Sequence, residues 1–158
     1  MTNDIATETA AETGELTYVR VHDAPAQLLF ECLTTPEHLT NFWGPTGTTT
    51  PVDRISVDLR PGGAFATVMV NDADGNEYRT LAHYDEIDPP NRLVWTEADS
   101  GMVTTITFAD LGDGRTEVTT HQRNVPAPYL SPEAQAGFQT SLDRCDAYVA
   151  RLVAGATG

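Results

Sequence analysis

The apolar positions near the end of the chain follow a helical period. Between Ser131 and Val153, apolar and small side chains recur at steps of three and four residues, which places them on one stripe of a helix. Ser131 suits the N-cap of this helix, Pro132 its first position and Gly155 its C-terminal end. The stripe consists of Ala134, Phe138, Ser141, Cys145, Tyr148, Val149 and Leu152. It predicts a long amphipathic helix whose apolar side needs a cover.

Between residues 51 and 123 the pattern changes to short apolar or alternating runs separated by turn residues. Pro61-Gly62-Gly63 and Gly112-Asp113-Gly114 are two of the turns. Strands at this spacing, joined by tight turns, are typical of an antiparallel meander. The predicted strands cover residues 52–59, 64–70, 78–87, 92–97, 102–108 and 115–123. This sheet is the natural cover for the C-terminal helix.

The first 50 residues predict a tail, one strand and two short helices. Residues 1–14 have no period and are expected to form a disordered tail, so that one domain spans residues 15–155. Residues 16–22 read as a strand, and Pro25 and Pro36 each start a short helix, the second reaching about Phe42. The predicted fold class is therefore α+β, with a curved antiparallel sheet of about seven strands wrapped around the C-terminal helix. The two short helices lie between the first two strands.

The net charge of the chain limits the classes of partner that it can bind. The 158 residues include 23 acidic and nine basic ones, all of the latter arginine, for a net charge of -14. Such a surface repels phosphate backbones and anionic headgroups, so we expect neither nucleic acid nor a membrane surface as a partner. A signal-peptide pattern and an apolar run of about 20 residues are both missing, which predicts a cytoplasmic location.

Several blocks of the sequence resemble one known superfamily. They are Trp43-Gly44-Pro45, residues 58–63, Asp74-Gly75, residues 84–93, and Gly137-Phe138 with Leu142. Together they resemble the START-like (SRPBCC) superfamily, in the branch named after the activator of heat-shock protein 90 ATPase. The resemblance runs from about Leu16 to Leu152.

This resemblance implies a helix-grip fold with a cavity between the sheet and the long helix. Across the superfamily such cavities hold lipids, hormones, polyketides and other apolar molecules, and some relatives are cyclases or dehydratases. Relatives usually carry Gly-Trp where this chain has Gly137-Phe138. The smaller ring either widens the cavity or repacks.

Motifs of catalysis and of metal binding are mostly missing from the sequence. There is no Gly-x-Ser-x-Gly elbow, and neither Cys32 nor Cys145 stands in a reactive motif. Both cysteines are expected to be buried free thiols, and a disulfide between them is the alternative that stays open. The histidines His22, His38, His83 and His121 have no paired spacing, and residues 72–75 fail as a calcium loop. We therefore expect no metal and no cofactor.

The candidate site residues are those that the predicted fold brings to the cavity. The predicted ligand-binding residues are Trp43, Phe65, Met69, Tyr78, Tyr84, Trp95, His121 and Phe138, with Trp43 at the cavity mouth. Candidates for an acid or base are His121, His83 and Tyr84. Whether His121 faces the cavity depends on the register of its strand.

Three functions stay open at this point. The first is a non-catalytic binder of a small apolar or aromatic molecule. The second is an enzyme of the cyclase, dehydratase or hydrolase kind that uses polar residues in the same cavity. The third is a protein-interaction module, either co-chaperone-like or a homodimer formed through an edge strand.

Overall fold

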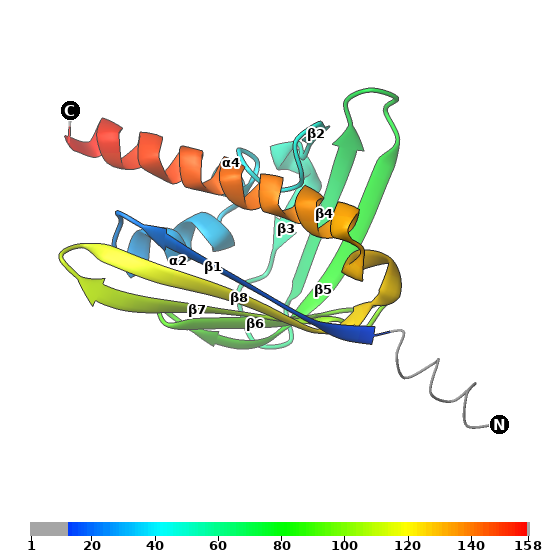
Figure 1. Cartoon of the computed structure of the whole chain (residues 1–158), viewed down its shortest axis with the longest axis horizontal. Helices are drawn as coiled ribbons and strands as arrows, with labels where there is room; N and C mark the ends of the chain where they lie inside the picture. Colours follow the sequence, from blue (N-terminus) through cyan, green and yellow to red (C-terminus); the bar gives the residue numbers. More distant parts are fainter. Residues whose placement is uncertain (1–12, 158) are drawn as a thin grey trace.

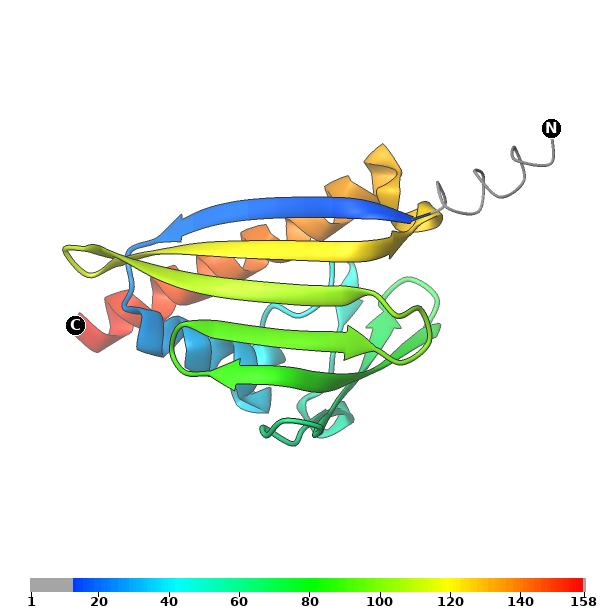
Figure 2. The same cartoon turned by 90° about the horizontal axis from the view of Figure 1, so that it is seen from below.

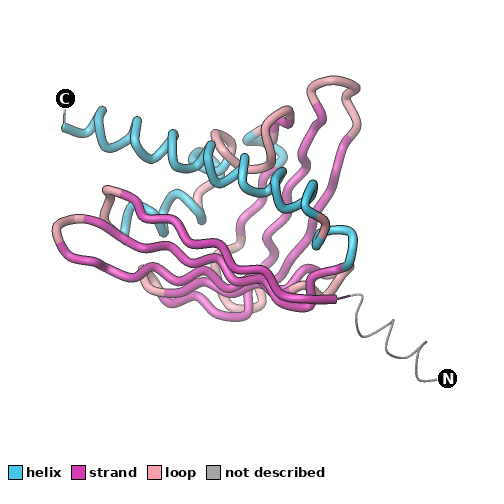
Figure 3. Tube along the Cα trace, viewed as in Figure 1, coloured by secondary structure: helices cyan, strands magenta, loops and turns pink. Residues whose placement is uncertain are grey.

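The computed structural model describes residues 13–157, in which a curved sheet lies against one long helix (Figures 1 and 3). The predicted α+β helix-grip fold is confirmed. Strand β1 (Thr13–His22) begins earlier than predicted, so Thr13 and Gly14 are strand and not tail. The rest of the predicted tail lies outside the described residues.

The sheet is antiparallel and has eight strands in the order β1-β8-β7-β6-β5-β4-β2, with β3 also paired to β4 (Figure 2). The strands after β1 are β2 (Thr48–Thr49), β3 (Ile55–Val57), β4 (Ala64–Asn71), β5 (Glu77–Asp88), β6 (Arg92–Glu97), β7 (Val103–Gly112) and β8 (Arg115–Pro126). The register of β5 against β6 shifts between Tyr84 and Glu86. Such a bulge bends a strand, and in Figure 1 β4 and β5 rise steeply away from the strands β6 to β8.

The long helix α4 (Pro132–Thr157) crosses the concave side of this sheet (Figure 1). Its start is as predicted, because the Ser131 hydroxyl accepts a hydrogen bond from the Ala134 amide at 3.1 Å. Its predicted end at Gly155 is wrong, since the helix continues to Thr157. Gly155 does not adopt the positive φ that commonly ends a helix at glycine.

The strand predicted over residues 52–59 is mostly replaced by other structure. Val52–Arg54 form a 3-10 turn, η1, in which the Arg54 amide donates to the Pro51 carbonyl at 2.9 Å. Only Ile55–Val57 pair with β4, and the chain then turns back at Gly62 and Gly63. A Cβ at Gly63 would lie 2.0 Å from the Asp58 carbonyl oxygen, so this turn admits only glycine there.

The two short helices close one end of the space between sheet and helix. Helix α2 (Ala26–Thr34) buries Leu29, Phe30 and Cys32, and the Phe30 ring lies 5.6 Å from that of Phe108 on β7. Helix α3 (Pro36–Leu39) is shorter than predicted, because the chain continues from Leu39 in turns. A second 3-10 turn, η2 (Ala127–Leu130), leads from β8 into α4.

Candidate functional site

A cavity of about 460 Å³ lies between the concave face of the sheet and α4. Its walls are mostly apolar, and side chains from α2, from the sheet and from α4 contribute to them. The apolar wall includes Leu29, Leu33, Phe42, Trp43, Phe65, Ile106 and Leu142.

The register of β1 against β8 decides which side chains reach the cavity. Tyr18 pairs with Thr120, and Arg20 pairs with Val118, and all four line the cavity. Because alternate residues of a strand face opposite sides, the neighbouring Val19 faces outward, where it is 52% exposed.

Five of the predicted ligand-binding residues lie on the cavity wall, and three do not. Those on the wall are Trp43, Phe65, Met69, Trp95 and Phe138. Tyr78 is half-exposed, at 49% of its surface, and lies off the wall. His121 faces away from the cavity and pairs with Glu15 at 2.9 Å, since its strand places Thr120 and Gln122 inward.

The three side chains proposed as acid or base also lie off the cavity wall. His83 is exposed on β5, and His121 faces outward as described. Tyr84 is 1% exposed and lies behind Phe65, with their rings stacked at 5.7 Å. Burial raises the pKa of Tyr84 well above its usual value, so its hydroxyl stays protonated.

One end of the apolar wall is an aromatic cluster. Trp43, Phe65 and Trp95 contact one another with ring centroids 5.2 to 6.3 Å apart, and Tyr84 stacks behind Phe65. Contacts of this kind fix the rings relative to one another, because edge-to-face and tilted pairs have preferred geometries. This part of the wall is therefore preformed.

The loop that carries Trp43 is tied to α4. The Arg144 guanidinium donates to the carbonyls of Gly44 at 2.7 Å and Pro45 at 3.0 Å, and the Thr46 amide donates to the Thr140 hydroxyl at 3.0 Å. Gly44 has a φ of +96°, and a Cβ there would lie 2.8 Å from the sulfur of Met69. The loop thus holds Trp43 against the cavity by contacts that depend on glycine.

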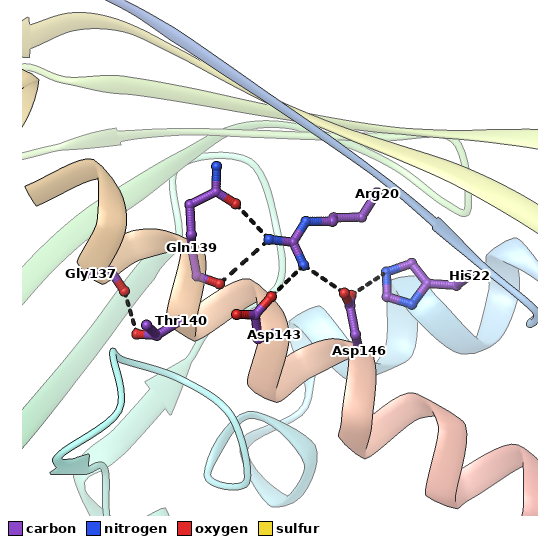
Figure 4. Close-up of polar contacts among 7 residues, drawn as sticks. All are labelled: Arg20, His22, Gly137, Gln139, Thr140, Asp143 and Asp146. Atoms are coloured by element: carbon purple, nitrogen blue, oxygen red, sulfur yellow. Dashed lines mark hydrogen bonds and ion pairs between the residues drawn. The ribbon is translucent and has the colours of Figure 1, made fainter. Parts of the chain in front are cut away.

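A charged network joins β1 to α4 along the cavity wall (Figure 4). Arg20 donates to Asp143 at 2.9 Å and to Asp146 at 2.6 Å, and also contacts Gln139. His22 lies 3.4 Å from Asp146. Burial lowers the pKa of His22 in spite of this carboxylate, so the imidazole is neutral at pH 7.

Several polar wall residues were not predicted from the sequence, and Glu97 and Gln122 are two of them. Glu97 lies on the cavity wall at the end of β6, and Gln122 lies there on β8. Glu97 precedes the turn at Ala98-Asp99, which suggests solvent exposure, but it shares a strand face with Trp95 two residues earlier. Burial, and to a lesser degree Asp99, raise the pKa of the Glu97 carboxyl.

Both cysteines are free thiols, as predicted. Cys32 is buried in α2, and Cys145 contributes to the cavity wall. Burial raises the pKa of Cys32 to about 11 and that of Cys145 to about 12. Neither is therefore a thiolate nucleophile at neutral pH.

The fold and the cavity define a helix-grip protein of the START-like superfamily. The family described as "Activator of Hsp90 ATPase homolog 1-like protein" matches residues 23–150, and the chain belongs to this family. Its START-type fold commonly binds hydrophobic ligands. None of the curated proteins matches the chain.

Solved structures from several bacteria have the same fold. A protein of Chromobacterium violaceum is 27% identical, with a TM-score of 0.77 over 84% of this chain and 95% of its own. A protein of Nitrosomonas europaea is 25% identical, with a TM-score of 0.76 over 89% and 97%. An AHSA1-like protein of Aeromonas hydrophila is 19% identical, with a TM-score of 0.72 over 87% and 94%, and shows similarity of fold alone.

From residue 13 to residue 157, no helix is long and apolar enough to cross a membrane. In the same part of the chain, His, Cys, Asp and Glu side chains form no group of three or more that could hold a metal ion.

Proposed function

We propose that this protein binds a small apolar or aromatic molecule in the cavity between sheet and helix, without catalysing a reaction on it. The volume of the cavity, about 460 Å³, carries the proposal, since ligand sites for small molecules usually measure about 300 to 1,000 Å³. The mostly apolar walls and the preformed aromatic cluster support it. The cytoplasm remains the location we propose.

The position of the polar side chains favours binding over catalysis. An enzyme needs an acid or base within reach of the substrate. The three predicted candidates, His121, His83 and Tyr84, lie off the cavity wall. Glu97 and the neighbouring pair His22 and Asp146 are titratable wall residues that keep the enzymatic alternative open. A change in the mass of a captured ligand on incubation with the protein would favour that alternative.

The first test is native mass spectrometry of the protein purified gently from its host, followed by denaturation and identification of any released molecule. The purified protein is also heated with a panel of neutral apolar and aromatic compounds. We expect a bound molecule or a raised melting temperature, because a ligand that binds only the folded state stabilises it. An empty protein that no compound stabilises would contradict the proposal.

A matched pair of variants tests whether the ligand binds in this cavity. Ala134 lies on the cavity wall in the first turns of α4, whereas Ala136 is exposed on the opposite side. Ala134→Phe fills part of the cavity, and we expect it to weaken binding of the neutral aromatic 1-aminoanthracene by about tenfold or more, or about 1.4 kcal/mol. Ala136→Phe should bind the dye like wild type. Fluorescence titration measures both, and equal affinities would place the dye elsewhere.

A further inference from the structure

Polar side chains form a band across the sheet side of the cavity. The band consists of Tyr18 on β1, Gln122 on β8, Thr104 on β7 and Glu97 on β6, and all four line the cavity. Thr104 pairs directly with Gln122 on one side and with Trp95 on the other. Glu97 is two residues beyond Trp95 on the same face, so the band crosses four adjacent strands.

The band contains polar groups that lack a partner within the protein. The hydroxyls of Tyr18 and Thr104 are buried and have no hydrogen-bond partner among residues 13–157. These two residues are 7% and 2% exposed. Buried polar groups are nearly always paired, because leaving one unpaired costs about 1 to 3 kcal/mol. Both hydroxyl oxygens lie below the cavity surface, whereas the polar ends of Gln122 and Glu97 are not buried in this way, so a ligand would meet these two side chains first.

The cavity offers no free positive charge beside the band. Arg20 is the only arginine among the described residues that line the cavity. Its guanidinium is already bound by Asp143 and Asp146, so these three side chains together carry a net negative charge. Arg144 is directed to the backbone carbonyls of the loop at Gly44. A carboxylate in the cavity would therefore face Glu97 and Asp146 without a counter-ion.

We propose that the cavity selects an uncharged, largely apolar ligand with a carbonyl or hydroxyl group at one end, that Gln122 binds this group, and that the Glu97 carboxylate excludes ligands bearing a carboxylate. This inference rests on the proposed function and specifies its ligand class. Glu97 in its protonated form donates a hydrogen bond to a carbonyl oxygen, and in its ionised form repels an anion. Only the ionised form disfavours a carboxylate relative to a neutral ligand, because a protonated Glu97 would also donate a hydrogen bond to a carboxylate oxygen.

A pair of nearly isosteric probes tests the selection. The neutral ketone 2-acetylnaphthalene and the anion 2-naphthoate have the same ring system and differ at the polar end. We measure their dissociation constants at pH 7.5 by displacement of 1-aminoanthracene from the full chain. For wild type we expect the ketone to bind at least about tenfold more tightly than the anion, a difference of about 1.4 kcal/mol.

Two variants then assign the selection to the band. Glu97→Gln keeps the shape of the side chain but removes the charge, and we expect it to reduce the ratio of the two constants to about threefold or less. Glu117→Gln makes the same change on β8 away from the cavity and should leave the ratio unchanged. Gln122→Met should weaken the ketone at least about threefold and leave unsubstituted naphthalene unaffected.

The outcomes separate this inference from the function on which it rests. If the dye and all the naphthalenes fail to bind wild type, the proposed function itself is contradicted. If they bind but the ketone and the anion bind equally well, or if Glu97→Gln leaves their ratio at the wild-type value, only the selection by Glu97 is overturned. Circular dichroism of each variant confirms that it is folded.

Discussion

At the scale of single residues, Glu97 combines a position on the cavity wall with a cost in stability. Its carboxyl is partly buried in a mostly apolar wall, and no other side chain among residues 13–157 hydrogen-bonds to it. Functional sites often keep such groups, because an unpaired polar group awaits a partner that the protein itself does not supply. Glu97 should therefore be replaceable with a gain in stability.

We predict that Glu97→Gln stabilises the protein at pH 7. The pKa of Glu97 is raised in the folded state above its ordinary value of 4.5, so the folded state binds more protons than the unfolded state as the pH rises through this range. The contribution of Glu97 to the free energy of unfolding is therefore fully present below pH 4.5. It is lost as the pH rises through the folded-state pKa, because the folded protein then has to hold an ionised carboxylate in the wall. The variant lacks this loss, so its advantage should appear above pH 4.5 and grow toward neutral pH.

Urea unfolding of both proteins at pH 4 and pH 7 measures this difference. Glu117→Gln serves as the control, because it makes the same change on β8 away from the cavity wall. A Glu97→Gln variant that is no more stable than wild type at pH 7 would contradict the predicted cost of burying this carboxylate.

At the scale of elements, the sequence predicts most strands but not which face of β1 and β8 is turned toward the cavity. Val19 and Val21 make β1 look like a strand that buries its valines, yet both are more than half exposed. The inward positions include Arg20 and His22, whose polarity is matched by acidic residues on α4. That match becomes visible only when the helix is placed beside the strand, so pattern alone could not find it.

The same limit explains which site residues could be predicted. Large aromatic residues such as Phe65 and Trp95 could be predicted, because a large aromatic side chain on a strand is usually packed on the buried face of the sheet. His121 and Gln122 are adjacent, and a one-residue change of register exchanges their faces. The sequence favoured His121 for its chemistry, whereas the pairing of β8 with β1 places Gln122 inward.

The contact between β1 and α4 leads to a second prediction. Arg20→Gln leaves Asp146 without its cationic partner on a cavity wall, and we expect it to lower the free energy of unfolding by about 1 to 3 kcal/mol. Arg123→Gln is a matched control on β8, since Arg123 is exposed and its side chain contacts no carboxylate within residues 13–157. Urea unfolding followed by tryptophan fluorescence compares the two. Equal losses of unfolding free energy in the two variants would show that the contacts of Arg20 with α4 stabilise the fold no more than an exposed arginine does.

At the scale of the whole molecule, the net charge of -14 acts on stability as well as on partners. Folding brings the acidic side chains closer together, so their mutual repulsion opposes the compact state. Exposed ion pairs such as Arg92 with Glu86 oppose this repulsion only weakly, because each surface pair contributes about 0 to 1 kcal/mol. Repulsion should therefore dominate the response of this protein to salt.

We predict that the melting temperature rises with ionic strength. The screening length falls from about 30 Å at 0.01 M salt to about 3 Å at 1 M, which removes repulsion across the molecule. A gain of 1 kcal/mol raises the melting temperature of a chain this long by about 2 to 4 °C, and we expect at least this shift between 10 mM and 500 mM sodium chloride at pH 7.5. Potassium chloride should give the same rise, since screening does not depend on the identity of the cation. A melting temperature that falls with both salts would show that the ion pairs, above all those of Arg20, outweigh the repulsion.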